Sequence, residues 1–315
     1  MPPPSPDVLP ALHGAPAAER AAAILPVPVG VVLGCPRSGS TFLMRALSTL
    51  PDTACLTGIA YPITLSHVVA ASPLAPEVRE ALLRAFPASL AQYLQSALFK
   101  ARAAGLQKWW NERSGLAGLR RALRGERRVD RLVFKEPFLS FAPEIVLESL
   151  PEAPVVYLLR DGRDVANSLV RTYDVLSDER LTRLTHSEMH LGRRVDHRYV
   201  PWWVEEGAED DFLAAPPYVR AVWMWKAMVE RCDAAFGAAP EGRVLTVRYE
   251  TFMPEPVTSG EVIAAHLGAE PTARYLGRLR EAHVASIGSY RKRAPDEIAA
   301  AERVAGGTLA RLGYR

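Results

Sequence analysis

Four segments of the chain are short runs of apolar, mostly β-branched residues, the pattern of strands that are buried inside a parallel sheet. The first run begins at Val27 and reads VPVGVVLG; the others cover residues 131–134, 154–159 and 243–248. The first three runs are each followed by a stretch with helical periodicity, such as FLMRALSTL after the first. This alternation predicts an α/β fold with a central parallel sheet that is flanked by helices.

The rest of the chain divides into helical patterns and two polar segments. Helices are expected within residues 75–125, around VRAVWMWKAMVERC, near residues 259–268 and 272–282, and after Pro295. Residues 1–25 are rich in proline and alanine, a composition that cannot offset its ordering entropy, so we expect a disordered tail. Residues 26–315 are expected to form a single domain. Within it, the polar segment 172–217 is long enough to be a helical insertion that acts as a lid over the acceptor.

The charge and cysteine content narrow the class of protein. The net charge of +3, from 38 basic and 35 acidic residues, is too balanced for a protein that coats nucleic acid. Three widely spaced cysteines argue against a disulfide scaffold and against a CxxC metal site. The apolar stretch at residues 21–33 is interrupted by Pro26 and Pro28, which argues against a signal peptide or membrane span. These features predict a cytoplasmic protein with no nucleic-acid or membrane partner.

Residues 34–41, GCPRSGST, follow the first strand and open the first helix. Backbone N–H groups and the positive end of the helix dipole converge on an anion at such a position. The segment almost matches the nucleotide-binding pattern GxxxxGK[ST], with Gly34 and Gly39 in place, but Ser40 occupies the lysine position. A kinase of this pattern uses that lysine on the phosphates. Here the cation is Arg37, inside the loop, so we expect a different chemistry.

A second anion site is expected after the third strand, in VVYLLRDGRDVANS. The strand ends at Arg160, and Ser168 lies eight residues later, on the second turn of the following helix. The fork of an arginine guanidinium suits a phosphate dianion, and the hydroxyl can close on the same group. Two such sites on neighbouring strand-to-helix turns predict a ligand with two separated phosphate groups.

The pair of motifs, PRSGST with a following Phe42 and RDGRDVANS, resembles the cofactor signature of the sulfotransferase family. Members of that family use 3′-phosphoadenosine 5′-phosphosulfate (PAPS), without a metal, on a P-loop-like nucleotide-binding fold. The resemblance implies that Arg37 lies at the bridging oxygen and the transferring sulfuryl group, and that Arg160 and Ser168 hold the 3′-phosphate. It implies 5′-phosphosulfate contacts for Ser38, Gly39, Ser40 and Thr41.

Weaker similarities extend the resemblance over residues 27–60, 130–175 and 240–315. Phe42 resembles an aromatic residue that borders the adenine, and Tyr249 in VRYETF resembles a tyrosine that meets it; both positions are equally compatible with core packing. The segment SIGSYRKR resembles a basic loop that closes over the cofactor, and the final RLGY is also typical of the family. That loop would add Ser286, Tyr290, Arg291 and Lys292 to the cofactor site.

Transfer to an alcohol or amine needs a base for the acceptor's proton. Glu136 is the first candidate because it follows the strand LVFK at the carboxyl edge of the sheet, where ligands of open α/β sheets bind. It could instead be a carboxylate that pairs with Lys135 or with an arginine. Pro137 disturbs an alignment with the K-x-H branch of the family, and CLTGI stands where another branch has GEE. His67 is a poorer candidate, since a lone histidine in an apolar stretch is more often structural.

Three other features have simpler interpretations. His186, His190 and His197, with Glu188 among them, could bind a metal, but a polar lid fits the flanking pattern better. The basic run over residues 113–131 could attract an acidic acceptor, although such runs are usually solvated. Four tryptophans could line an acceptor pocket, with core packing favoured for the last two: Trp202, Trp203, Trp223 and Trp225.

The sequence therefore predicts a PAPS-dependent sulfotransferase whose acceptor is a hydroxyl or amine on a small molecule, or on a molecule linked to a carrier or polymer. An ATP-dependent kinase of the P-loop type is one alternative; Mg²⁺-dependent ATP turnover would favour it. A non-catalytic module that binds PAPS or its product PAP (adenosine 3′,5′-bisphosphate) is the other.

Overall fold

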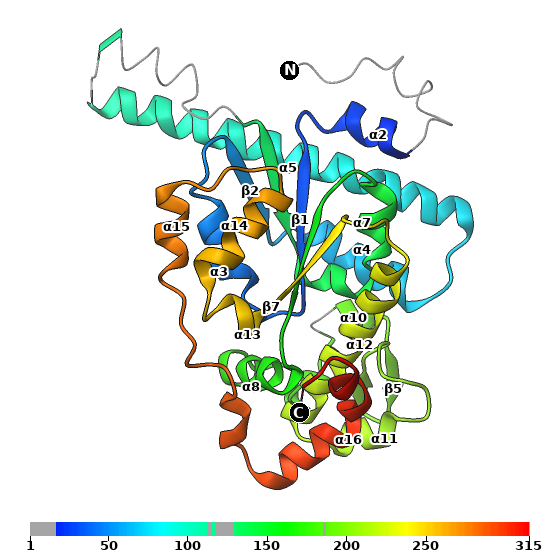
Figure 1. The fold of residues 1–315 in the computed structure, drawn as a ribbon. Coiled ribbons are helices and arrows are strands. Elements are labelled where there is room, and N and C mark those ends of the chain that lie inside the picture. The colour runs from blue at the N-terminus through cyan, green and yellow to red at the C-terminus, as the bar shows by residue number, and fades with distance from the viewer. Residues whose placement is uncertain (1–16, 113–114, 117–128, 185–186, 315) are drawn as a thin grey trace.

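A computed structural model describes residues 17–112, 115–116, 129–184 and 187–314 (Figure 1). Its main sheet has five strands in the order β2-β3-β1-β4-β7, and every neighbouring pair is parallel. The α/β prediction is therefore confirmed, and four of the strands lie where the sequence predicts them. The bounds of the five strands are β1 Val29–Leu33, β2 Thr53–Thr57, β3 Arg131–Lys135, β4 Val155–Leu159 and β7 Val244–Arg248.

The strand β2 was not predicted, because only its first residue is fully buried. Its burial falls from Thr53 at the start to the exposed Thr57, and it lies at one edge of the sheet beside β3. An edge strand is covered less than a central one, so its sequence TACLT lacks the continuous apolar run that marks β1 and β4.

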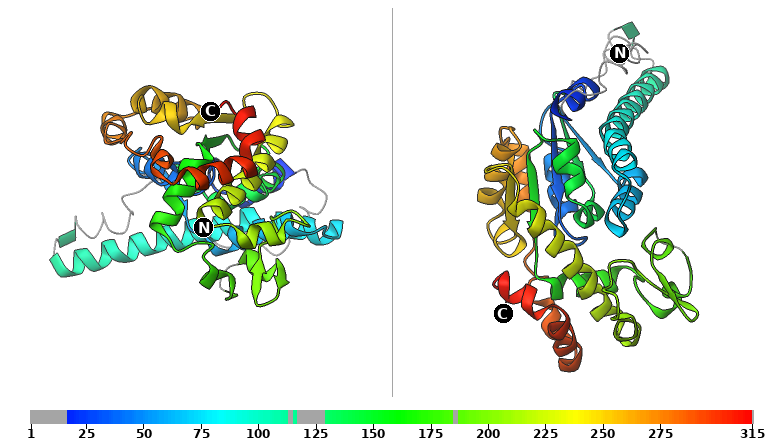
Figure 2. Two further views of the ribbon diagram at one scale, coloured as in Figure 1. Left: turned by 90° about the horizontal axis from the view of Figure 1, so that it is seen from below. Right: turned by 90° about the vertical axis from the view of Figure 1, so that its right-hand side faces the viewer.

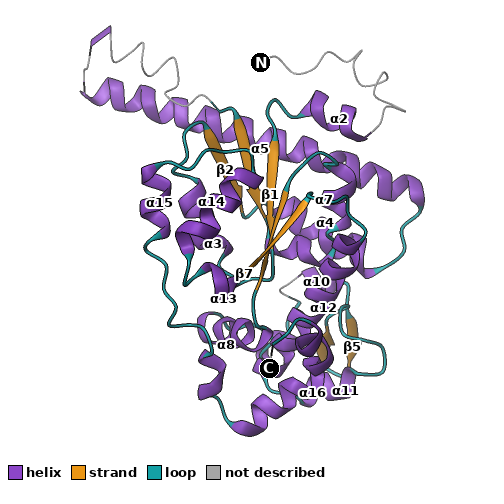
Figure 3. Ribbon diagram, viewed as in Figure 1, coloured by secondary structure: helices purple, strands orange, loops and turns teal. Residues whose placement is uncertain are grey.

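The sheet separates two hydrophobic cores, because successive side chains of a strand point to opposite faces. Along β1, Val31 and Leu33 belong to the larger core, whereas Val32 belongs to the smaller one. Helices cover both faces (Figures 2 and 3). The larger core is packed against α4 Ala60–Ala71, α5 Pro76–Glu112, η1 Pro137–Phe141, α7 Glu144–Ser149, α8 Gly162–Thr172, α12 Pro217–Gly237 and α16 Pro295–Arg311. The smaller core is packed against α3 Ser40–Leu47, α13 Tyr249–Phe252, α14 Pro256–His266 and α15 Ala273–Leu279.

The predicted tail is wrong for residues 17–24, which form the helix α2 Ala17–Ile24. Ala21 and the following Leu25 are buried in the larger core, and α2 packs against α5 and α7. The sequence AAERAAAI consists mostly of the strongest helix former and contains no proline, so this part of the segment can fold once it has a surface to cover. Residues 1–16 lie outside the described residues.

The predicted insertion is only partly helical. The described residues of this segment form three short helices and a two-stranded antiparallel hairpin: α9 Asp178–Leu181, α10 Ser187–His190, β5 Arg193–Val195, β6 Arg198–Val200 and α11 Glu209–Ala214. The buried Arg220 of α12 attaches it to the body, because its guanidinium donates to the carbonyls of Leu176, Phe212 and Leu213. Because a buried guanidinium donates several hydrogen bonds to this segment, the segment is firmly attached to α12.

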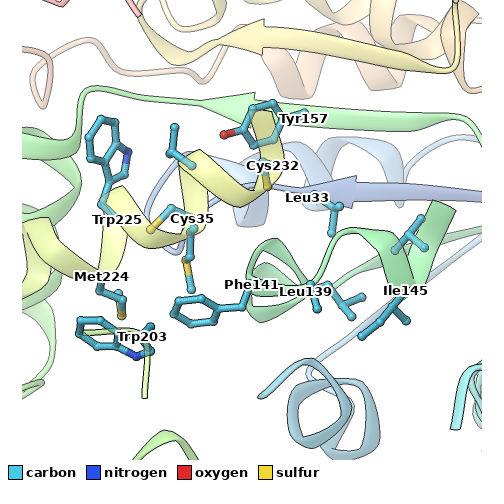
Figure 4. Packing of buried hydrophobic residues seen from close by; sticks show 14 of the residues in the cluster. Leu33, Cys35, Leu139, Phe141, Ile145, Tyr157, Trp203, Met224, Trp225 and Cys232 are labelled. Atoms are coloured by element: carbon cyan, nitrogen blue, oxygen red, sulfur yellow. The ribbon is translucent and has the colours of Figure 1, made fainter. Parts of the chain in front are cut away.

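The larger core extends to the first strand-to-helix turn, and Figure 4 shows Cys35 of that turn among the core residues. Cys35 of that turn is buried there, as are Cys232 and Trp225 of α12. The tryptophan prediction is confirmed for Trp225, which is fully buried, and Trp203 is also part of this core. Among the described residues, no helix is long and apolar enough to cross a membrane.

Candidate active site

The turn after β1 is shaped by a close approach to β4. Gly34 has φ 137°, and a Cβ there would lie 2.4 Å from the carbonyl oxygen of Leu158. Its N–H donates to Ser140 Oγ at 3.1 Å, which joins the turn to η1. Gly39 caps the start of α3 with φ 89°. We call residues 34–41 the anion loop. The backbone conformation of this loop therefore requires both of its glycines.

Arg37 is the cation of this loop and the only non-glycine residue in it with positive φ, at 74°. A side chain in this region costs about 1 kcal/mol, so the surroundings must hold it. The carbonyl of Arg37 accepts from Arg160 Nη1 at 2.7 Å. The Nε of Arg37 donates to Ser168 Oγ at 2.9 Å, and the Arg37 guanidinium lies 5.7 Å from the ring centre of Tyr173. Residues that the sequence assigned to two different phosphates are thus in direct contact.

Arg160, at the end of β4, is buried and joins three segments of the chain. It donates to the carbonyls of Arg37 at 2.7 Å and of Ser286 at 2.8 Å. Its guanidinium also stacks on the ring of Tyr249, at 4.1 Å from the ring centre. Its Nε is buried and has no hydrogen-bond partner among the described residues, so one donor is left to be satisfied.

The second motif also holds the basic loop in place. The buried Asp164 of α8 accepts from the backbone N–H groups of Gly288 and Tyr290 and from Ser289 Oγ, at 2.6 to 3.0 Å. Asn167 donates to Ser289 Oγ and accepts from Arg293. The short helix η2 Ser289–Lys292 is therefore fixed against α8. RDGRDVANS and SIGSYRKR, more than a hundred residues apart, form one structural unit.

These segments enclose a pocket of about 510 Å³. A pocket of this size suits a small ligand. Its walls carry three cationic side chains and four hydroxyl groups, a lining that favours an anion with several oxygens. The lining residues are Arg37, Ser168, Arg171, Thr172, Ala285, Ser286, Ser289 and Lys292.

Four of these lining residues were not predicted from the sequence: Arg171, Thr172, Ala285 and Ser289. Ser168, Arg171 and Thr172 are spaced i, i+3 and i+4 on α8, so they share one face of that helix. This spacing was readable in the sequence once Ser168 had been assigned. An arginine in the last turn of a helix is usually explained by the helix dipole instead.

Lys135 is a further residue that the sequence analysis did not assign to the site. Its Nζ lies 3.4 Å from Thr41 Oγ1, because residue 135 and the anion loop meet on the face of the sheet that α3 covers. Burial lowers the pKa of Lys135, although the neighbouring Glu136 opposes that shift. A lysine of the neighbouring strand thus lies next to the residue that follows position 40 of the loop.

Glu136 points to the opposite face from Lys135 and is only 2 % exposed. Its Oε1 accepts from the N–H of Phe138 at 3.2 Å, so it caps η1. Burial raises the pKa of this carboxyl to about 7, against smaller opposing effects of the Phe138 N–H and of Lys135. A carboxyl with such a pKa can take or release a proton near neutral pH.

The predicted aromatic contacts lie outside the pocket lining. Phe42 packs against Phe252 with ring centres 5.9 Å apart, in the smaller core. The Tyr249 hydroxyl forms a hydrogen bond with Ser286 Oγ at 2.8 Å. Tyr290 is buried and stacks beneath Arg163 at 4.2 Å, whereas Arg291 is exposed. Tyr249 therefore connects Arg160 to the basic loop.

His67 lies in an aromatic cluster rather than in the anion pocket. Trp202 Nε1 donates to its Nδ1 at 3.1 Å, and its Nε2 lies 3.8 Å from Glu188 Oε2. Among the described residues no cluster of three histidines, cysteines or carboxylates could hold a metal ion. His186 and most of the basic run, residues 113–114 and 117–128, lie outside the described residues.

Comparison with known protein families identifies the family of this chain. The model of the sulfotransferase family matches residues 28–214, more than half of the 315-residue chain. The match includes the anion loop, β3, β4 and α8. The chain belongs to the sulfotransferase family. Among curated proteins, none matches this sulfotransferase in sequence.

Several solved structures resemble this sulfotransferase in fold at low sequence identity. The sulfotransferase domain of the olefin synthase from Synechococcus PCC 7002 is 19 % identical, with 89 % of this chain and 95 % of that one covered and a TM-score of 0.43. A sulfotransferase from Mycobacterium avium is 14 % identical, with 96 % and 80 % covered and a TM-score of 0.46. One from Alicyclobacillus acidocaldarius is 18 % identical, with 90 % and 94 % covered and a TM-score of 0.45.

The close approach at Gly34 gives a first testable prediction. In this sulfotransferase, Gly34→Ala is expected to lower the free energy of unfolding by about 3 kcal/mol, because the new Cβ meets the backbone of β4 and the φ of 137° is unfavourable. Chemical denaturation followed by circular dichroism would measure the loss. Gly58→Ala is the matched control, since Gly58 also has positive φ but nothing lies within 4 Å of its Cβ position. Equal losses in the two variants would contradict the steric explanation.

Proposed function

We propose that this sulfotransferase binds PAPS and transfers its sulfuryl group to a hydroxyl or amine of a small or carrier-linked acceptor. The observation that carries the proposal is the contact between Arg37 Nε and Ser168 Oγ at 2.9 Å. It brings together the anion loop after β1 and the phosphate motif after β4 at one pocket. A ligand with phosphate groups at both ends of its ribose can span such a site.

The residues present fit this cofactor. Ser38 Oγ and Arg160 Nε are buried without a hydrogen-bond partner among the described residues, and buried polar atoms are usually satisfied. Ser168 Oγ accepts from Arg37, which leaves its own O–H free to donate to a phosphate oxygen. Arg37, Arg171 and Lys292 supply positive charge around the pocket, which lies next to Arg160 but is not lined by it.

PAPS, when bound, supplies the sulfuryl group, and PAP is the product that remains. Arg37 would place a guanidinium beside the leaving 5′-phosphate, and Lys135 would add a second cation through its position next to Thr41. Glu136 would receive the acceptor's proton on a carboxylate oxygen, a role that its pKa of about 7 supports. The segment 172–217 would orient the acceptor and exclude water.

Calorimetric titration of the purified protein tests the proposal. PAP is expected to bind at least tenfold more tightly than AMP, which lacks the 3′-phosphate, and ATP is expected to bind weakly. A screen of acceptors with labelled PAPS would then show turnover. Equal dissociation constants for PAP and AMP would contradict the two-phosphate site, and binding without turnover on any acceptor would support a non-catalytic module instead.

Arg160→Ala should weaken the binding of PAP by about 10- to 100-fold and leave the binding of AMP almost unchanged, because the charge-assisted contact that the unpartnered Nε would make to the 3′-phosphate is lost. Calorimetry with both nucleotides measures the two effects. Arg278→Ala, which removes an exposed arginine of α15, serves as a control and should change neither constant. A parallel loss for PAP and AMP in Arg160→Ala would mean that the residue only supports the loops.

A further inference from the structure

The last turn of the described chain places one tyrosine side chain by its backbone. Helix α16 ends with Gly313 in the left-handed region, at φ 76°. Gly313 N donates to Ala310 O at 2.9 Å, and Tyr314 N donates to Leu309 O at 2.8 Å. This pair of bonds is the Schellman motif, in which glycine is favoured. The motif fixes the direction in which Tyr314 leaves the helix.

Tyr314 is attached to the end of β7. Its hydroxyl donates to Glu250 Oε2 at 3.1 Å, and the guanidinium of Arg248 lies 4.9 Å from its ring centre. Arg248 also donates to the carbonyl of Leu312. Burial raises the pKa of the Tyr314 phenol, so the hydroxyl remains a donor at every working pH. Three contacts therefore join the last turn to residues 248–250.

The Glu250 carboxylate also contacts the motif that follows β4. Glu250 Oε1 accepts from the backbone N–H of Asp161 at 2.9 Å, so one side chain bridges Tyr314 and the residue directly after Arg160. The preceding Tyr249 stacks on the Arg160 guanidinium at 4.1 Å. The dipeptide Tyr249-Glu250 thus holds both the side chain of Arg160 and the backbone N–H of the next residue. Figure 1 shows α16 lying beside α8, the helix that Asp161 opens.

We propose that Tyr314 is a positioning residue that, through Glu250, holds Arg160 for the 3′-phosphate. This inference rests on the proposed function, since it assigns a task within the PAP site. With both donors in place, each oxygen of the Glu250 carboxylate is occupied. Without the Tyr314 hydroxyl, the carboxylate can turn toward Arg248 and release the Asp161 N–H. The turn directly after Arg160 then loses one of its anchors, while the side-chain contacts of Arg160 with Arg37, Ser286 and Tyr249 remain.

The test is Tyr314→Phe, which keeps the ring and its contact with Arg248 but removes the hydroxyl. The dissociation constant for PAP is expected to rise about fivefold, whereas that for AMP stays the same. The matched control is Tyr275→Phe, because the hydroxyl of Tyr275 donates to Gly260 O at 2.9 Å in the smaller core, away from the pocket. This control should lower the thermal midpoint and leave both dissociation constants unchanged.

A double variant tests the route through Glu250. If Tyr314 acts through that carboxylate, Tyr314→Phe combined with Glu250→Gln should bind PAP no more weakly than Glu250→Gln alone. Additive losses, or an unchanged PAP-to-AMP ratio in Tyr314→Phe, would overturn the inference while the proposed function stands. Equal binding of PAP and AMP by the unmodified protein would instead overturn both.

Discussion

Replacing Arg37 by alanine is expected to lower kcat by about 100- to 1000-fold while the dissociation constant for PAP changes by only a few-fold. The guanidinium enters the pocket from the anion loop, where it would stabilise charge that develops on the leaving phosphate. Because Arg37 already carries a Cβ at φ 74°, alanine adds no new backbone strain. The release of PAP from labelled PAPS, with the best acceptor from a screen, measures the effect.

Arg37→Lys separates charge from geometry. Lysine keeps the positive charge but cannot reproduce the donor fork, so we expect it to recover part of the lost turnover. The Nε contact to Ser168 would also be lost, and Ser168→Ala therefore provides a reference for that contact alone. An Arg37→Ala variant that kept its kcat and lost only affinity would contradict a role in the transition state.

Replacing Glu136 by glutamine is expected to lower kcat by about 100- to 10 000-fold. Glutamine retains an oxygen that can accept from the Phe138 N–H, so the cap of η1 survives while the base is lost. Turnover measured under the conditions used for the Arg37 variants gives the size of the loss. Near-normal turnover of Glu136→Gln would show that this carboxyl only caps η1.

The raised pKa of Glu136 also sets the direction of two pH effects. The base acts as a carboxylate, so kcat should rise with pH through an apparent pKa of about 7. Folding favours the protonated form, whose stabilisation is complete below the unfolded pKa of about 4.3 and is lost as the pH rises through about 7. Thermal midpoints of the unmodified protein should therefore fall between pH 5 and 8. The fall should be smaller in Glu136→Gln; parallel curves would contradict the assignment.

The sequence predicts those parts of the fold that depend only on the residues of a single short segment. The runs that became β1 and β4 are buried on both faces, and this burial alone requires continuous apolar residues. Gly34 and Gly39 were also informative, because a positive φ leaves few alternatives to glycine. The half-buried β2 and the helix α2 were missed, since both depend on surfaces that other segments provide.

The candidate site was predictable to the extent that its motifs are contiguous. Arg37, Arg160 and Ser168 lie in two short motifs, and hydrogen bonds connect these motifs in the fold. Lys135 reaches Thr41 across two strands, and its role could be seen only when the register of β1 and β3 was known. The bridge from Tyr314 to Asp161 depends in the same way on the packing of α16 near β7.

The burial of Cys35 has a practical consequence for work with thiol reagents. Burial, with a smaller effect of Cys232, raises the pKa of the Cys35 thiol well above its ordinary value, and burial likewise raises the pKa of Cys232. Only the thiolate reacts with alkylating agents and oxidants, so both side chains stay inert at neutral pH while the protein is folded. A maleimide dye would therefore attach at the partly buried Cys55 on β2, away from the cysteine beside Arg37. Single-site fluorescent labelling needs no removal of native cysteines.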